Sequence, residues 1–380
     1  MIRTIELGPI RPPSEAQSLL LRVTRNCAWN QCRFCTIYKE QRFGTRPMED
    51  IKADIDQIAL YRNHILETGA LQAPYGATLF GEQLRDLPEE VVQSYLQVLN
   101  WVGNGEESVF LQDADVMVLT FDKLREILLY LREKLPRIKR VTSYGRADSL
   151  AKFSVEQLVE LKKAGLDRIH SGYETGSDQV LALIRKGYTK AQEIEVGRRV
   201  KAAGIEFSIY YMPGVGGEAL SEDNALETAD VVNQINPDFV RIRTFVPKQN
   251  TGLAEDIANH ALHPCTDAEK ALELKRMIAN INSADGYLYS DHIINLFEDV
   301  KGNMKTDKEK MLSVFTAFEA LDPHKQRMYQ LARRMGMVRS LAQMDMLGKE
   351  QLENIDHYLA QLDTEEKFEA FLLSCLRRYI

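Results

Sequence analysis

The chain has 380 residues and a formal net charge of −7 at pH 7, with the apolar and charged content of an ordinary soluble protein. Its length suits two domains, or one large domain with an appendage. No apolar run approaches the roughly 18 residues that a membrane span requires, and the first residues carry no apolar signal core. We therefore expect a cytoplasmic protein without a membrane partner. The acidic charge and the lack of a long basic run disfavour a nucleic-acid partner.

Short apolar segments alternate with helical patterns from residue 19 to about residue 250. The predicted strands are 19–24, 108–112, 140–144, 167–171, 206–212 and 239–244. Between them, Thr120 is a predicted helix N-cap, Ser154 and Gln157 form a predicted capping box, and Gly165 and Gly204 mark predicted helix ends. This alternation is typical of a parallel sheet with right-handed crossovers.

Six such units are too few for an eight-fold barrel. The sequence therefore predicts an α/β fold, either an open doubly wound sheet or, as we expect, a partial (β/α)6 TIM-like barrel over residues 19–250. In both folds ligands bind at the carboxyl ends of the strands.

Three further segments surround or interrupt this core. Residues 1–18 form a predicted N-terminal extension. An insertion at about 71–105 contains Phe80-Gly81-Glu82-Gln83-Leu84 and a helical stretch from 88 to 102. After Thr251 the strand signals stop, and residues 251–380 form a predicted all-helical C-terminal domain. Its expected helices are 267–284, 306–321, 323–336, 349–362 and 364–378.

Three of the five cysteines lie within nine residues, directly after the first predicted strand. Cys27, Cys32 and Cys35 have the spacing C-x4-C-x2-C, which suits a metal site in a reducing compartment better than disulfides. A cubane iron–sulfur cluster normally takes four thiolates. Three thiolates would leave one iron open, much as an open position marks catalytic zinc. The alternative is a structural zinc site that takes a distant fourth ligand such as His170.

Other motifs follow in order along the chain. An aromatic residue, Phe34, precedes the last clustered cysteine. The remaining segments are Val109-Phe110-Leu111-Gln112-Asp113-Ala114-Asp115, Ser143-Tyr144-Gly145-Arg146-Ala147-Asp148, Gly172-Tyr173-Glu174-Thr175-Gly176-Ser177-Asp178 with Ile184-Arg185-Lys186-Gly187-Tyr188-Thr189, and Met212-Pro213-Gly214-Val215-Gly216-Gly217-Glu218. Together with the cysteines, these segments make residues 19–250 resemble a radical S-adenosylmethionine enzyme. The similarity is to the branch with Elongator-like, coproporphyrinogen-dehydrogenase-like and methylthiotransferase-like enzymes.

The chain departs from the family pattern in two places. The usual cysteine spacing is C-x3-C-x2-C, so the first gap here is one residue longer. The turn after the second strand lacks the usual paired glycines, because Ala114 carries a Cβ.

The resemblance implies a [4Fe-4S] cluster on Cys27, Cys32 and Cys35, and S-adenosylmethionine as the second cofactor. The site residues that it implies for the cofactor are Asp113 or Asp115 for the ammonium group, Lys186 or Arg146 for the carboxylate, Glu174 for the ribose, Phe34 for the adenine, and the turn at Gly214 for a close backbone approach to the adenine. Reductive cleavage would give a 5′-deoxyadenosyl radical that abstracts hydrogen from a small-molecule substrate. The electron would come from a donor such as flavodoxin or ferredoxin.

Four residues beyond these motifs are weaker candidates for substrate chemistry. Arg241 and Arg243 alternate on the last predicted strand and share one face, where they meet either an acidic substrate or barrel carboxylates. Asp291 and His292 belong to the polar run Tyr289-Ser290-Asp291-His292, which supplies a proton, binds substrate or caps a helix.

Two other functions compete with the first. One is an RNA-modifying enzyme of the same branch, similar to a methylthiotransferase. The other is a non-catalytic protein that binds zinc or an iron–sulfur cluster.

Overall fold

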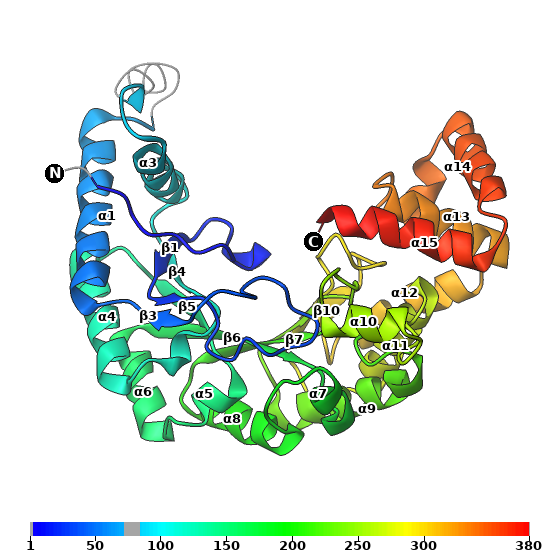
Figure 1. The fold of residues 1–380 in the computed structure, drawn as a ribbon, viewed down its shortest axis with the longest axis horizontal. Coiled ribbons are helices and arrows are strands. Elements are labelled where there is room, and N and C mark those ends of the chain that lie inside the picture. Colours follow the sequence, from blue (N-terminus) through cyan, green and yellow to red (C-terminus); the bar gives the residue numbers. More distant parts are fainter. Residues whose placement is uncertain (1–2, 72–83, 380) are drawn as a thin grey trace. The chain divides into compact units, whose positions relative to one another are not determined.

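The computed structural model of the protein describes residues 3–71 and 84–379 (Figure 1). Most of the segment Phe80-Gly81-Glu82-Gln83-Leu84 lies outside this part. The strands are β1 (Leu19–Arg22), β2 (Thr24–Arg25), β3 (Gly44–Thr45), β4 (Ser108–Gln112), β5 (Arg140–Tyr144), β6 (Leu166–Glu174), β7 (Glu206–Tyr211), β8 (Phe239–Ile242), β9 (Tyr287–Tyr289) and β10 (Lys301–Asn303).

The helices connect these strands and form most of the region after them. They are α1 (Met48–Thr68), α3 (Glu89–Gly103), α4 (Phe121–Lys134), α5 (Ala147–Leu150), α6 (Val155–Ala164), α7 (Asp178–Leu183), α8 (Lys190–Ala202), α9 (Ser221–Ile235), α10 (Gly252–Ala258), α11 (Asp267–Ala279), α12 (Lys308–Glu319), α13 (Pro323–Arg334), α14 (Lys349–Gln361) and α15 (Glu365–Leu376). No described helix combines the length and apolar content that crossing a membrane requires.

The described strands form an eight-stranded sheet with the order β1-β4-β5-β6-β7-β8-β9-β10, and β2 pairs with β3 separately. The pairs β1–β4, β4–β5, β5–β6, β7–β8 and β8–β9 are parallel, and β9–β10 is antiparallel. The six predicted strands correspond to β1 and β4 to β8. The α/β class and the partial-barrel type are therefore confirmed.

The chain divides into two compact units. The first comprises Met1–Asn30, Glu40–Ser171 and Arg199–Glu206, and the second comprises Gln31–Lys39, Gly172–Arg198 and Phe207–Ile380. In the first unit, α1 packs against α3 and α4, and α4 packs against α6 (Figure 1). Local sequence sets the ends of these helices: Thr120 caps α4, and Ser154 with Gln157 forms the capping box of α6. Gly165 ends α6 at a φ of 113°, a backbone conformation that favours glycine.

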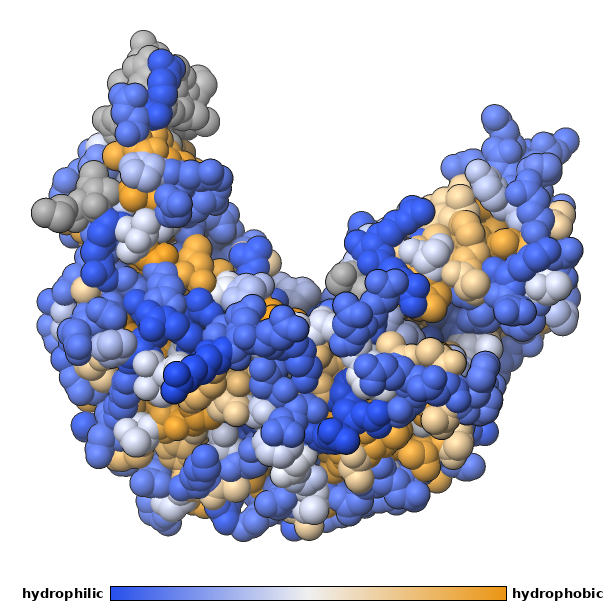
Figure 2. All heavy atoms as spheres, viewed as in Figure 1, coloured by the Kyte–Doolittle hydropathy of each residue, from blue (hydrophilic) through white to orange (hydrophobic). Residues whose placement is uncertain are grey.

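In the second unit, α9 and α11 pack together, and α13 contacts both α14 and α15 (Figure 1). Hydrophilic residues cover much of the face shown in Figure 2, while the apolar residues Ile355, Leu359, Phe368 and Leu372 of α14 and α15 are buried. The tail is not entirely helical as predicted, because β9 and β10 lie within it. Each has three residues, too few for a detectable alternation of apolar and polar side chains. Independent folding of residues 251–380 stays a prediction.

Candidate functional site

The cysteine loop, residues 26–36, begins in the first unit. Asn26 and Asn30 take left-handed backbone conformations, with φ of 64° and 46°, and turn the chain on either side of Cys27. The Asn30 N–H lies 3.3 Å from Cys27 Sγ and donates to it. Such bonds to sulfur are among the features that tune iron–sulfur clusters. Trp29 lies against Arg146, whose guanidinium carbon is 5.2 Å from a ring centroid, so a cation–π contact holds this half of the loop to the segment after β5.

The rest of the loop lies in the second unit, where Arg33 anchors it. Arg33 Nη2 lies 2.7 Å from Asp256 Oδ1 and donates to the carbonyl of Gly252 at 3.0 Å. The Arg33 N–H donates to the carbonyl of Ile184, and the Leu253 N–H donates to the carbonyl of Arg33. These contacts tie the backbone between Cys32 and Cys35 to α7 and α10.

Phe34, predicted to contact the adenine, packs against a buried apolar cluster in this unit. The cluster consists of Val180, Ile184, Met212, Val215, Phe245, Leu253 and Leu262. Two of its members, Met212 and Val215, belong to the turn that contains Gly214. Phe34 is half-buried, so part of its ring remains available to a ligand beside this turn.

The convergence of the three thiols stays a prediction. None of the five cysteines forms a disulfide, and Cys32 is more buried than Cys27 and Cys35. Among residues 3–71 and 84–379, no three His, Cys, Asp or Glu side chains are gathered as metal ligands would be. His170, the alternative zinc ligand, lies in β6 with its Nε2 3.6 Å from Glu15 Oε1, and both side chains are fully buried.

The two acids of the turn after β4 differ in their surroundings. Asp113 is fully buried, and its Oδ2 accepts hydrogen bonds from Arg22 Nη2 at 2.7 Å and Arg22 Nε at 3.0 Å. Such a fork of two donors is the strong form of an ion pair. The Asp113 carboxylate is therefore already paired with the guanidinium of Arg22.

Asp115 ties two strand-end loops together. Its Oδ1 accepts from the backbone N–H groups of Met117 and Arg146, both at 3.2 Å, and its Oδ2 accepts from Ser149 Oγ at 2.6 Å. Burial raises the pKa of Asp115 to about 6, and these hydrogen bonds limit the rise. Both oxygens are occupied, so Asp115 joins the segment after β4 to the segment after β5.

Glu174 and Lys186 lie together in the second unit. Lys186 Nζ is 3.7 Å from Glu174 Oε1 and donates to the carbonyl of Gly172, which also accepts from Tyr188 Oη at 2.9 Å. Glu174 has a φ of 69°, which is a left-handed backbone conformation. This conformation is strained for a residue that carries a Cβ, and such strained residues cluster at functional sites. A Cβ on Gly172 would lie 2.5 Å from Glu174 Oε1, so a side chain there would push this carboxylate out of its present position.

The turn at Gly214 depends on a carboxylate that the sequence analysis did not single out. Glu273 of α11 accepts four hydrogen bonds: from the Gly214 N–H at 3.0 Å, Tyr211 Oη at 2.7 Å, Ser221 Oγ at 2.7 Å and Asn224 Nδ2 at 2.6 Å. Burial raises the pKa of Glu273 to about 7, against the four donors, which favour the ionised form. Glu273 therefore fixes the turn to the helix behind it.

The weaker candidates lie at the ends of β8 and β9. Arg241 Nη1 is 3.9 Å from Asp291 Oδ2, so these two predicted residues meet. His292 Nδ1 accepts from the Ile294 N–H at 3.3 Å, and burial, with Arg243 nearby, lowers the pKa of His292 to about 4. Asp291 and His292 begin no helix, so capping does not explain them.

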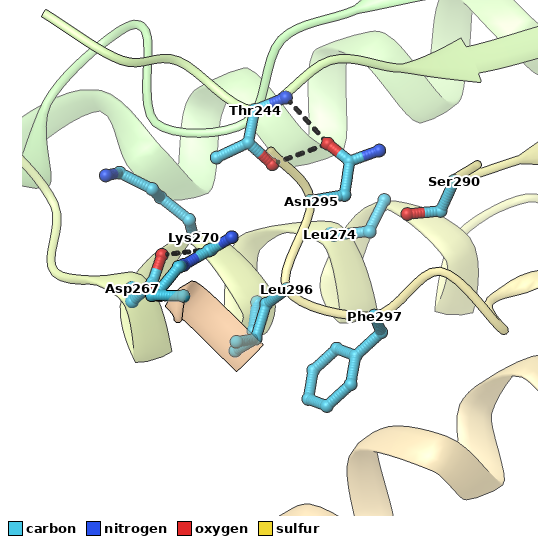
Figure 3. A pocket seen from close by; sticks show the side chains of 10 residues that line it. Thr244, Asp267, Lys270, Leu274, Ser290, Asn295, Leu296 and Phe297 are labelled. Carbon is cyan, nitrogen blue, oxygen red and sulfur yellow. Dashed lines mark hydrogen bonds and ion pairs between the residues drawn. The ribbon is translucent and has the colours of Figure 1, made fainter. Parts of the chain in front are cut away.

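Ser290, from the same run, turns away into a small pocket (Figure 3). There Thr244 donates to Asn295 Oδ1 through its backbone N–H at 3.0 Å and its hydroxyl at 2.9 Å. The buried ion pair of Asp267 and Arg334, at 2.7 Å, lines the pocket too and joins α11 to α13. These contacts stabilise the interior of the second unit.

Comparison with known proteins decides the family. Over residues 21–229, more than half of its length, the chain matches the Radical SAM superfamily. The chain belongs to the radical S-adenosylmethionine superfamily. Membership makes it a radical SAM enzyme and implies a [4Fe-4S] cluster and S-adenosylmethionine as its cofactors.

Its similarity to individual proteins is distant. A tRNA-2-methylthio-N(6)-dimethylallyladenosine synthase from Syntrophus aciditrophicus is 25% identical over 317 residues, which cover 80% of this chain and 59% of that protein. An uncharacterized methyltransferase from Pyrococcus horikoshii is 26% identical over 184 residues, or 48% of this chain and 38% of that protein. The solved structure of the cobalamin-dependent S-adenosylmethionine radical enzyme OxsB has a TM-score of 0.46 at 15% identity, covering 96% of this chain and 58% of that one. The chain spans less than two thirds of the length of each.

The donor chemistry of this radical SAM enzyme fits an iron–sulfur cluster. The cysteine loop offers three thiols outside any disulfide, one with an N–H donor on its sulfur, and Trp29 and Arg33 hold its two halves. Sequence reasoning missed Trp29, Arg33, Arg22 and Glu273. The sequence did indicate that Glu273 is buried, because it lies four residues before Met277 on the apolar face of a predicted helix. Gly252 and Asp256, two side-chain partners of Arg33, lie 219 and 223 residues away and left no local signal.

Proposed function

We propose that this radical SAM enzyme cleaves S-adenosylmethionine reductively and uses the resulting 5′-deoxyadenosyl radical to abstract hydrogen from a small-molecule substrate. The proposal depends above all on the cysteine loop, in which Cys27, Cys32 and Cys35 are the cluster ligands. When bound, the cluster supplies one electron to the sulfonium, which yields methionine and the radical.

The residues of the chain would bind and orient the cofactor. We assign the carboxylate to Lys186, whose ammonium already lies beside Glu174, and the ribose hydroxyls to Glu174. Phe34 and the backbone at Gly214 border the same apolar cluster, which suits the adenine. The ammonium would go to Asp113 or Asp115: Asp113 already pairs with Arg22, and the two oxygens of Asp115 already accept three hydrogen bonds. Arg146 would then hold Trp29 through the cation–π contact. The alternative is that Arg146 binds the carboxylate of S-adenosylmethionine.

The substrate class and the electron donor belong to the same proposal. A small molecule fits the net charge of −7, which opposes binding to a polyanion. The electron would come from a flavodoxin or ferredoxin, and five cysteines that form no disulfide suit the reducing cytoplasm. One observation favours RNA modification instead: the similarity to the tRNA-modifying synthase extends over 80% of this chain.

Anaerobic reconstitution with iron and sulfide, followed by a 5′-deoxyadenosine assay, tests the proposal. With S-adenosylmethionine and dithionite, the wild-type protein should form deoxyadenosine, and Cys32→Ala should form none. Cys265→Ala is the matched control, because Cys265 is a buried free thiol outside the loop. Equal product from the wild type and Cys32→Ala would contradict the ligand assignment.

A further inference from the structure

Arg22, the last residue of β1, uses every nitrogen of its guanidinium group. Its Nε and Nη2 both donate to Asp113 Oδ2, at 3.0 Å and 2.7 Å. Its Nη1 donates to Glu6 Oε1 at 3.2 Å and to the carbonyl of Leu7 at 3.3 Å. Its Nη2 donates in addition to Asn26 Oδ1 at 3.3 Å. One side chain, only 13% exposed, therefore joins the N-terminal segment, the turn after β4 and the cysteine loop.

Asn26 carries this contact to the first predicted cluster ligand. It immediately precedes Cys27, and its φ of 64° turns the chain at this point. Its Oδ1 accepts from Arg22, while its Nδ2 donates to the carbonyl of Arg42 at 2.7 Å. Both ends of the Asn26 amide are bonded, so the backbone enters Cys27 in a fixed direction.

The turn that holds Arg22 is itself fixed. The Asp113 N–H donates to Thr24 Oγ1 at 3.3 Å, and the Asp113 side chain is fully buried. A Cβ added to Gly8 would lie 2.9 Å from Asp113 Oδ1, so the N-terminal segment packs directly against this carboxylate. The Gly8 N–H donates to Gln112 Oε1 at 2.9 Å. Arg22 therefore binds the cysteine loop from a rigid base.

The burial of this ion pair needs a reason other than stability. Desolvation offsets most of the attraction between two buried charges, so an apolar pair of similar volume would often be as stable. What an arginine adds is a rigid planar fork with five N–H donors, which lysine does not reproduce. We propose that Arg22 is a positioning residue: through Asn26 it holds the Cys27 thiol in place beside the turn after β4. The inference rests on the proposed function, because Cys27 is a proposed cluster ligand.

Alkylation of the full-length protein without cofactors measures how firmly Cys27 is held. Iodoacetamide labelling followed by peptide mass spectrometry gives separate rates for Cys27 and Cys35, which are both half-buried. Arg22→Lys keeps the positive charge but loses the fork, and Asn26→Gly keeps the turn, because glycine adopts a positive φ readily. Each variant should alkylate Cys27 faster by about threefold or more, relative to Cys35, as the loss of one hydrogen bond would allow.

Three further variants serve as controls. Asn26→Asp keeps an acceptor for Arg22 and tolerates the left-handed backbone, so Cys27 should react at the wild-type rate. Arg25→Lys should also leave the rate unchanged, because Arg25 donates to Glu6 from the separate strand β2. The double variant Arg22→Lys/Asn26→Gly should react no faster than the faster single variant, since both substitutions remove the same contact.

Unchanged alkylation of Cys27 in both single variants, or an equal acceleration at Cys35, would overturn the inference. This readout needs no cluster, so it separates the two proposals. A wild-type protein that binds no iron, or forms no deoxyadenosine, would contradict only the proposed function, and a selective acceleration at Cys27 would still support the role of Arg22. In reconstituted protein, Arg22→Lys and Asn26→Gly should also release iron to a chelator faster than the wild type, and equal release would contradict the positioning role.

Discussion

Glu273 offers a sharp test of how the turn at Gly214 is held. Its carboxylate is fully buried and accepts four hydrogen bonds, three of them from the side chains of Tyr211, Ser221 and Asn224. Glu273→Ala would leave these buried donors without their acceptor, and each unsatisfied group costs about 1–3 kcal/mol. Because such costs are not additive, we expect a loss of about 3–6 kcal/mol in the free energy of unfolding. That is a large share of the roughly 5–15 kcal/mol of a typical protein.

The substitution Glu273→Gln keeps the shape of the side chain and removes its negative charge. Burial raises the pKa of Glu273 from 4.5 to about 7. An acid with a raised pKa in the folded state contributes stability that is fully present below its unfolded pKa and is lost as pH rises through its folded pKa. The window is therefore about pH 4.5 to 7, and 2.5 pKa units correspond to about 3 kcal/mol. A glutamine, which does not titrate, should match the wild type near pH 5 and be more stable by up to about 3 kcal/mol at pH 8.

Urea unfolding followed by far-UV circular dichroism, at pH 5 and pH 8, measures both variants against the wild type without cofactors. The difference between Glu273→Gln and the wild type cancels the other titrating groups. A glutamine variant that is less stable than the wild type at pH 8 would contradict this prediction. It would show that the four donors outweigh burial and keep the carboxylate ionised.

Two further predictions concern the first unit. Asp115→Ala should lower the free energy of unfolding by about 2–4 kcal/mol, because three buried donors lose their acceptor; unchanged stability with weakened S-adenosylmethionine binding would instead assign Asp115 to the cofactor. Trp29→Leu should cost less than about 1 kcal/mol, the size of a half-exposed cation–π contact, yet should slow deoxyadenosine formation because the cysteine loop loses its contact with Arg146. A Trp29→Leu enzyme with the wild-type rate, measured with the same iron content, would contradict this role.

Much of the fold was predictable because its signals are local. The strands β1 and β4 to β8, the N-caps at Thr120 and Ser154 and the glycine end at Gly165 each depend on a few neighbouring residues. The short strands β9 and β10 were missed, because pairing makes them strands: β9 pairs with β8, and β10, in the described part of the chain, pairs only with β9. The partner of β9 lies far away along the chain. Pairing across 45 or more residues is absent from any local window.

The candidate site was predictable to a smaller extent. Motifs indicated Glu174 and Lys186, which the structure brings together at 3.7 Å. Arg241 and Asp291, weaker candidates outside the motifs, meet at 3.9 Å. The sequence could not show that the two carboxylate oxygens of Asp115 accept hydrogen bonds from backbone N–H groups and a hydroxyl. That outcome depends on how two strand-end loops fold against each other.

Binding of S-adenosylmethionine should change the reduced iron–sulfur cluster of this enzyme. Electron paramagnetic resonance of the reconstituted, dithionite-reduced enzyme should show a [4Fe-4S] signal that shifts when S-adenosylmethionine is added, because three thiolates leave one iron open to it. Cys265→Ala should show the same shift, and Cys32→Ala should lack the signal. A cubane signal that S-adenosylmethionine leaves unchanged, or zinc bound in place of iron, would contradict the account.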